Sequence, residues 1–273
     1  GVFSRSTPDG DFSVTRDVRL VANAIHGNGL PGVDTLHNTY LQSIGVRVEF
    51  NRFGPLRAGA RGNAIKDRSV GTIVRYNRIE QGAHAIDLVE AEDYATIATA
   101  DPAYRTAFVY GNQIIKNGET GSFIHYGGDH YDCCEANFRR GTLYVFHNTV
   151  IATGGDARLF QLSTTLETAR VWNNVFAFAS TVAYPSMRSG SETGTGYVSG
   201  GTVVLGRNWL TAGWADSDPY HPVDGTLSGA GQAVTGTAWP IDAATFVPLA
   251  GSAIIDAAQP APADAVLGEH ADV

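Results

Sequence analysis

Five polar side chains occupy the same position in five short, similar segments of this chain. The segments span residues 38–41, 64–67, 85–88, 123–126 and 159–162, and their third residues are Tyr40, Lys66, Asp87, His125 and Gln161. Hydroxyl, ammonium, carboxylate and imidazole groups can transfer protons, and the guanidinium of Arg68, two residues after Lys66, is suited to holding a carboxylate. If the segments lie side by side, they present one row of reactive side chains.

Such a row requires strands that stack in register, and a repeat in the chain provides them. Seven asparagines recur at intervals of 28, 26, 35, 36, 26 and 34 residues: Asn23, Asn51, Asn77, Asn112, Asn148, Asn174 and Asn208. The residue three before and the residue two after each asparagine are apolar in all seven cases. With 43% hydrophobic residues, fourteen apolar positions would coincide by chance about once in 10⁵. The repeat therefore organises the chain.

The repeat predicts a parallel β-solenoid. Both apolar positions point inward around a sharp bend at the asparagine, and a single turn cannot bury its apolar face without its neighbours. Stacked asparagines would form a hydrogen-bonded ladder. We expect an all-β, single-domain chain over residues 1–273, with rungs over 12–210, a C-terminal closing segment over 211–273 and long insertions, 89–106 and 127–141, on one face.

The repeated segments resemble a known fold family. VEFNRF, VRYNRI, VYGNQI, VFHNTV and VWNNVF are similar to rungs of the right-handed parallel β-helix superfamily, which includes the pectate lyases, and residues 246–256 resemble its closing segment. Residues 66–69, Lys-Asp-Arg-Ser, look similar to the Lys-Ser segment of alginate-lyase-like members. The resemblance implies a polysaccharide lyase, although Asp87 stands in the next rung, where no arginine is found.

A lyase that cleaves a uronic-acid polymer by β-elimination needs a cation for the uronate carboxylate, a base for the C5 proton and an acid for the leaving oxygen. We expect Arg68 to bind the carboxylate, Lys66 to act as base, and Tyr40 or His125 to act as acid, with the alternative that either of these exchanges roles with Lys66. Asp87, beside Lys66 in the row, completes the predicted catalytic set.

Further residues are predicted to contact the substrate or a metal. The predicted substrate-binding residues are His37, His84, Tyr126, Asp129 and Gln161. Lyases that the chain resembles commonly use Ca²⁺, and the acidic insertion offers Glu90, Glu92 and Asp93 as oxygen ligands. No cofactor is assigned with certainty.

Two other functions remain open at this stage. A glycoside hydrolase would use two carboxyl groups across the scissile bond, with Asp87 paired with Asp129 or Glu90. A non-catalytic carbohydrate-binding solenoid would bind a glycan without converting it. The products would distinguish these functions, because only a lyase leaves an unsaturated sugar.

Composition excludes several other classes. The net charge of −8 and the pI near 5.4 argue against a general nucleic-acid binder. No apolar run approaches eighteen residues, so we expect no membrane span. The chain begins Gly-Val-Phe without a signal peptide, and we expect a processed, secreted protein that is extracellular or periplasmic. The adjacent Cys133 and Cys134 are too few for a structural zinc site and suggest thiols or a local disulfide.

Overall fold

The computed structural model describes residues 1–8, 13–117, 121–190, 200–220 and 222–270. In these ranges, 24 strands form three parallel sheets of eight strands, named here sheets A, B and C. Sheet A contains β1 (Val2–Phe3), β4 (Thr39–Leu41), β7 (Ile65–Asp67), β10 (Ile86–Leu88), β13 (Ile124–Tyr126), β16 (Arg158–Leu162), β19 (Ser186–Ser189) and β22 (Ala215–Ser217).

Sheets B and C complete each turn. Sheet B contains β2 (Arg16–Val21), β5 (Ile44–Glu49), β8 (Val70–Arg75), β11 (Thr106–Tyr110), β14 (Thr142–Phe146), β17 (Thr168–Trp172), β20 (Thr202–Leu205) and β23 (Thr226–Ser228). Sheet C contains β3 (Ala24–Ile25), β6 (Arg52–Phe53), β9 (Arg78–Glu80), β12 (Gln113–Lys116), β15 (Thr149–Ala152), β18 (Val175–Phe178), β21 (Trp209–Thr211) and β24 (Val234–Gly236).

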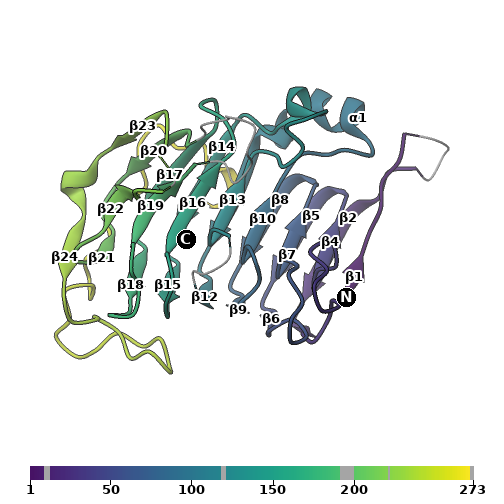
Figure 1. Ribbon diagram of the computed structural model, residues 1–273. Helices are drawn as coiled ribbons and strands as arrows, with labels where there is room; N and C mark the ends of the chain where they lie inside the picture. The colour runs from purple at the N-terminus through teal and green to yellow at the C-terminus, as the bar shows by residue number, and fades with distance from the viewer. Residues whose placement is uncertain (9–12, 118–120, 191–199, 221, 271–273) are drawn as a thin grey trace.

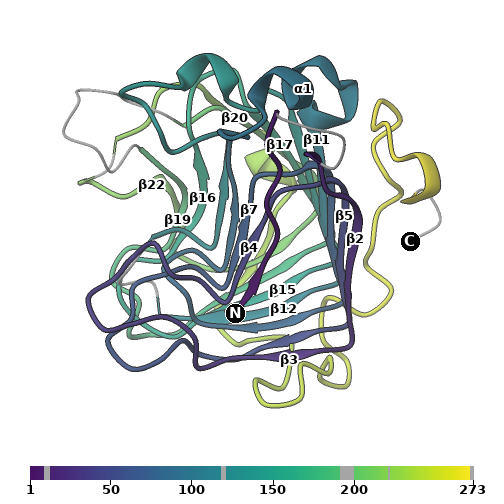
Figure 2. The same ribbon diagram turned by 90° about the vertical axis from the view of Figure 1, so that its right-hand side faces the viewer.

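The three sheets wind into a β-helix. The chain passes from sheet A to B to C and returns to sheet A one turn further along the axis (Figure 1). Seen from the N-terminal end in Figure 2, the turns run clockwise as they recede, so the winding is right-handed. The predicted all-β parallel solenoid is confirmed.

The interior consists of the apolar residues that the repeat places inward. Val74, Val109, Val145 and Val171 pair in register along sheet B, and all four are 0% exposed. Inward residues of sheets A and C join the same buried cluster. Because each turn contributes a few side chains to one continuous core, the stack of turns provides the stability.

A row of asparagines holds the bend between sheets B and C. Asn51 Nδ2 donates to Asn77 Oδ1 at 3.0 Å, and Asn77 Nδ2 donates to Asn112 Oδ1 at 3.0 Å. The same bond links Asn23 to Asn51 and continues from Asn112 to Asn208. Residues just before ladder asparagines, such as Phe50 (φ 60°) and Tyr76 (φ 56°), have left-handed backbone. The ladder therefore stabilises a bend that L-residues rarely adopt.

The winding extends beyond the predicted limits of residues 12–210. Strand β1 precedes residue 12, and β22, β23 and β24 follow residue 210 in their respective sheets. These end strands have two or three residues, too few to show an alternating pattern in the sequence. After β24, the described chain leaves the helix and runs along its outside (Figure 2).

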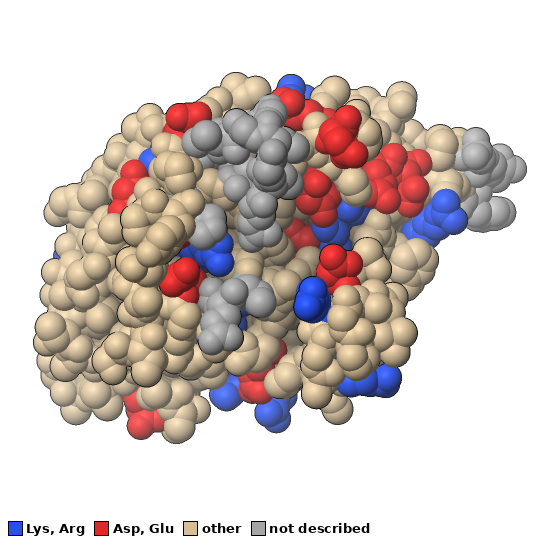
Figure 3. Space-filling model, in the orientation of Figure 1, with Lys and Arg blue, Asp and Glu red and all other residues tan. Residues whose placement is uncertain are grey.

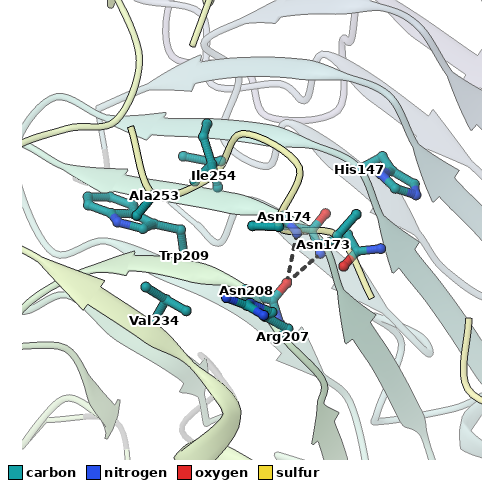
Figure 4. Close-up of a pocket in the computed structure, with 12 residues that line it drawn as sticks. His147, Asn173, Asn174, Arg207, Asn208, Trp209, Val234, Ala253 and Ile254 are labelled. Carbon is teal, nitrogen blue, oxygen red and sulfur yellow. Dashed lines mark hydrogen bonds between the residues drawn. The ribbon is translucent and has the colours of Figure 1, made fainter. Parts of the chain in front are cut away.

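The C-terminal segment covers two outer surfaces. Leu267 joins a buried cluster on sheet B that contains the stacked rings of Tyr110, Phe146 and Trp172, whose neighbouring centroids are 4.7 Å apart. Near the end of the ladder, Figure 4 shows Asn174 bonded to Asn208 in a cavity that Ala253 and Ile254 also line. This segment shields outward aromatic and ladder residues from water.

Both predicted insertions connect sheet A to sheet B. The first carries α1 (Ala95–Ala100) and the 3₁₀ turn η1 (Pro102–Arg105), and the second carries η2 (Glu135–Asn137) and a Cys133–Cys134 disulfide. The remaining 3₁₀ turns are η3 (Ala230–Gln232) and η4 (Gly268–His270). Among the described residues, no helix has the length and apolar character needed to cross a membrane.

The ladder predicts a position-dependent loss of stability. Asn112→Ala removes three bonds donated by its amide and leaves the Asn77 backbone and side-chain amides without their acceptor. We expect the free energy of unfolding in urea to fall by about 3 kcal/mol, because buried donors and acceptors lose partners. The control Asn23→Ala, at the exposed end, should cost about 1 kcal/mol or less. Equal losses would contradict a cooperative ladder.

Candidate active site

The predicted row of side chains exists in register on the outer face of sheet A. Tyr40 pairs with Lys66, Lys66 with Asp87, Asp87 with His125, and His125 with Gln161. The row lines a cleft of about 540 Å³, together with residues of both insertions and of the loops that precede the strands. In Figure 3, acidic and basic side chains lie side by side on this face. The structure thus brings together side chains from five separate turns.

Lys66 lies between two carboxylates. Its ammonium is 2.7 Å from Asp87 Oδ2 and also contacts Asp129 Oδ2, and its side chain is 6% exposed. Burial alone lowers the pKa of Lys66, but the charges of Asp87 and Asp129 outweigh it and raise the pKa above its ordinary value. Lys66 is therefore an ammonium ion, which argues against its predicted role as a base.

Arg68 is the second cation, and it also contacts Asp129. Its Nη2 lies 3.0 Å from Asp129 Oδ1 and 3.1 Å from Glu92 Oε2, and its Nη1 lies 3.2 Å from Glu90 Oε2. The guanidinium also lies 5.8 Å from the ring centroid of Tyr40. The two cations converge on one carboxylate, that of Asp129, whose pKa stays well below its ordinary value because Lys66 and Arg68 outweigh the effect of burial.

Asp87 and His125 form the buried part of the row. Asp87 Oδ1 bonds His125 Nδ1 at 2.8 Å, and Asp87 Oδ2 accepts from Asn63 Nδ2 at 2.5 Å. Burial would raise the pKa of Asp87, but Lys66 and His125 hold it well below its ordinary value. Because Asp87 is 1% exposed and its oxygens are occupied, it positions its neighbours and has no open oxygen toward the cleft.

The polar chain continues from His125 to the second insertion. His125 Nε2 lies 2.9 Å from Ser163 Oγ, which accepts from the Gly128 amide at 2.8 Å and donates to the Gly128 carbonyl at 2.7 Å. Nδ1 donates to the ionised Asp87, and although burial lowers the pKa of His125, Asp87 raises it overall, which favours the imidazolium. The contacts therefore connect His125 to the residue that precedes Asp129.

A second ladder, which was not predicted, runs beside the row. The backbone amide of Asn63 donates to His37 Nδ1, that of His84 donates to Asn63 Oδ1, and that of Ser122 donates to His84 Nδ1. Each side chain lies two residues before the inward residue of its strand, so their common spacing could have revealed the ladder. Burial and the Lys66 charge lower the pKa of His37 to about 4. His37 is thus neutral at neutral pH.

The second insertion contributes His130, which was not among the predicted site residues. Its Nδ1 lies 2.6 Å from Glu90 Oε1, and its side chain is 40% exposed in the cleft. Glu90 is fully buried and also accepts the backbone amides of Asp129 and His130. The bond to Glu90 raises the pKa of His130 and, in the neutral ring, leaves Nε2 as a proton acceptor. No spacing in the sequence pointed to this pair.

Tyr40 and Gln161 stand at the two ends of the row. Tyr40 stacks on Phe3 with centroids 5.5 Å apart, and its hydroxyl accepts from Gln42 Nε2 at 3.2 Å. Burial raises the pKa of Tyr40, so the phenol is protonated at neutral pH. Gln161 lines the cleft, and its buried Oε1 has no hydrogen-bond partner among the described atoms. Both residues face the cleft as predicted.

The prediction that Tyr126 binds substrate is wrong. Tyr126 is 0% exposed and belongs to the interior cluster, because it follows outward His125 by one residue and strand side chains alternate. The predicted His37, His84 and Asp129 all line the cleft.

The predicted calcium ligands already contact cationic side chains. The oxygens of Glu90 accept amides and contact Arg68, Glu92 pairs with Arg68, and Asp93 accepts from Gln42 and contacts Arg5. A guanidinium among these carboxylates occupies the place and charge that a cation would need. These residues do not fit a calcium site.

Comparisons of the chain with protein-family models, curated proteins and solved structures found no match. The geometry of the cleft is therefore the basis for assigning a function.

The His125 contacts predict a pH-dependent stability. Burial lowers the pKa of His125, but the bond to Asp87 outweighs burial and raises the pKa above 6.5. The folded state binds this proton more tightly than the unfolded state, so the stabilisation is complete below pH 6.5 and disappears as pH rises through the folded pKa. Urea unfolding across this range should show a decline in stability that is steeper in wild type than in His125→Gln, which keeps the contribution of His130.

Two controls accompany this measurement. The exposed His26→Gln should retain the full decline. His130→Gln removes another imidazole with a raised pKa and should retain the His125 component. A His125→Gln profile parallel to that of wild type would refute the imidazolium assignment.

Proposed function

We propose that this protein is a polysaccharide lyase that cleaves a uronic-acid-containing polysaccharide by β-elimination. The observation that carries the proposal is the convergence of Lys66 and Arg68 on a single carboxylate at the wall of the cleft. Membership of the pectate-lyase-like superfamily and secretion are parts of the same proposal. The Cys133–Cys134 disulfide supports an oxidising compartment.

Carboxylate binding by buried cations is the central requirement of β-elimination. The charges of Lys66 and Arg68 are little screened, because their side chains are 6% and 4% exposed. Asp129, with 31% of its side chain exposed, turns toward solvent as the uronate carboxylate takes its place on Arg68. Neutralising that carboxylate makes the neighbouring C5 proton more acidic.

His130 and Tyr40 are suited to the two proton transfers. His130 Nε2 removes the C5 proton, while Glu90 stabilises the imidazolium that forms. The C5–H electrons form the C4–C5 double bond, the C4–O4 bond breaks, and the Tyr40 hydroxyl protonates the departing oxygen. Arg68 contacts the Tyr40 ring and, through Glu92 and Asp129, the His130 side of the cleft. In this assignment His130 replaces Lys66 as the base.

Asp87 and His125 are then positioning residues, and Lys66 joins them to the carboxylate site at Asp129. They alternate in charge below the cleft floor and, through Ser163, fix the backbone at Gly128. Asp87 and His125 are 1% and 2% exposed, and their polar atoms already bond to one another, to Lys66 and to Ser163.

The hydrolase alternative has less support. The oxygens of Asp87 already accept from Lys66, His125 and Asn63, and Lys66 lies between Asp87 and Asp129. A general acid or base needs an oxygen open to the substrate.

Incubation with pectate, alginate and glycosaminoglycans, assayed for both ultraviolet absorbance and reducing ends, tests the assignment. Reducing ends without an unsaturated chromophore would indicate a hydrolase, and neither signal would indicate a binding protein.

Substitution of the proposed acid and base should abolish turnover without unfolding the protein. Tyr40→Phe and His130→Gln each remove one proton-transfer group, and we expect kcat to fall by at least about 100-fold. The matched controls Tyr76→Phe and His26→Gln lie outside the cleft and should retain wild-type kcat. Circular dichroism checks folding, and full turnover in His130→Gln would reject it as the base.

A further inference from the structure

A second groove adjoins the active-site cleft and differs from it in charge. The two share Arg61, Ala83 and His84, and the groove encloses about 630 Å³. Its cationic lining residues are Arg57, Arg61 and Arg158, and no acidic residue lines it among those described. The chain as a whole carries a net charge of −8, so this concentration of arginine is local.

Two of these arginines have no counterion among the residues that the structure describes. Neither Arg57 nor Arg61 forms an ion pair or side-chain hydrogen bond with a described residue, and both are exposed. Elsewhere on the outer face of sheet A, Arg68 contacts three acidic side chains and Arg188 pairs with Asp216. Arg57 and Arg61 are therefore available to an external anion.

The backbone holds the two arginines in place. The Arg57 amide donates to the Asn28 carbonyl at 2.9 Å, and the Arg61 amide donates to the Val33 carbonyl at 3.0 Å. Residues 55–61, 81–84, 121 and 158 belong to successive turns, so the groove runs along the axis beside the row of sheet A. A linear ligand that passes through the cleft can enter this groove.

We propose that the groove is a subsite for the anionic group of a neighbouring sugar in the polysaccharide. The inference rests on the proposed function, and it specifies a substrate with charges on more than the cleaved residue. A guanidinium binds a carboxylate or a sulfate through paired N–H donors, so both groups share the required chemistry. His84 lies where the groove meets the cleft and would contact the sugar between the two sites.

Oligosaccharide length and charge provide the test. Binding of galacturonate hexamer, chondroitin sulfate hexasaccharide, neutral cellohexaose and free galacturonate is measured by calorimetry on wild type and on Arg57→Ala/Arg61→Ala. We expect the double variant to bind an anionic hexamer about tenfold more weakly, with a smaller salt dependence. Free galacturonate, which fills only the cleft, should bind the single variant Arg57→Ala as it binds wild type, because Arg57 lines the groove and not the cleft. Because chondroitin sulfate carries carboxylates as well as sulfates, a loss of affinity for the galacturonate hexamer identifies the carboxylate as the group bound, and a loss confined to chondroitin sulfate identifies the sulfate.

The control is Arg19→Ala/Arg207→Ala, which removes two exposed arginines elsewhere and should bind like wild type. The subsite would be overturned by unchanged hexamer binding in the Arg57/Arg61 variant, by no hexamer binding in wild type, or by an equal loss of affinity for cellohexaose.

Measurements of turnover separate the subsite proposal from the lyase proposal. Arginine-dependent binding without an unsaturated product supports the subsite and rejects the lyase, whereas unsaturated product formed with unchanged kcat/KM by the double variant rejects only the subsite.

Discussion

A turn of this β-helix has no core of its own, because its apolar side chains meet only those of the turns on either side. Parallel pairing in register is therefore the constraint on which the rest of the structure depends. A slip of one residue in any strand would exchange its inward and outward side chains. The asparagine ladder opposes such a slip, since each amide bonds its own turn and the next.

The same register places charged side chains in the outer row of sheet A. Burying these charges would destabilise the fold if they had no partners of opposite charge. Lys66 and Asp87 are nearly buried, and each retains its charge because neighbouring turns supply the opposite one. His125 joins this arrangement through bonds from both ring nitrogens. The result is a fixed row of alternating charges beneath the cleft. The more exposed groups that line the cleft can contact a ligand.

The strands, the insertions and the loops contribute different parts of the cleft. Sheet A supplies the buried framework, and the second insertion supplies Asp129 and His130. Buried Arg139 anchors that insertion to the sheet, with Nη2 3.0 Å from Asp67 Oδ2. The loop before β7 supplies Arg57 and Arg61 of the adjoining groove. Acidic and basic surfaces thus lie side by side, which suits a polymer that carries several charges.

The sequence by itself determined the winding, the inward core and the order of Tyr40, Lys66, Asp87, His125 and Gln161 along one face. These features follow from alternation and from a repeat, both of which are local properties of the chain. The same alternation, followed to the last residue of the strand that carries His125, would have placed Tyr126 inside. The second ladder was also present in the spacing of His37 and His84.

Only the tertiary structure decided which members of the row meet solvent and which protons they hold. The approach of Asp129 to Lys66 and Arg68, and of Glu90 to His130, joins residues of insertions that have no periodic pattern. Burial and the distance between charges set a pKa, and neither is encoded in the type of a residue or in its position along a strand.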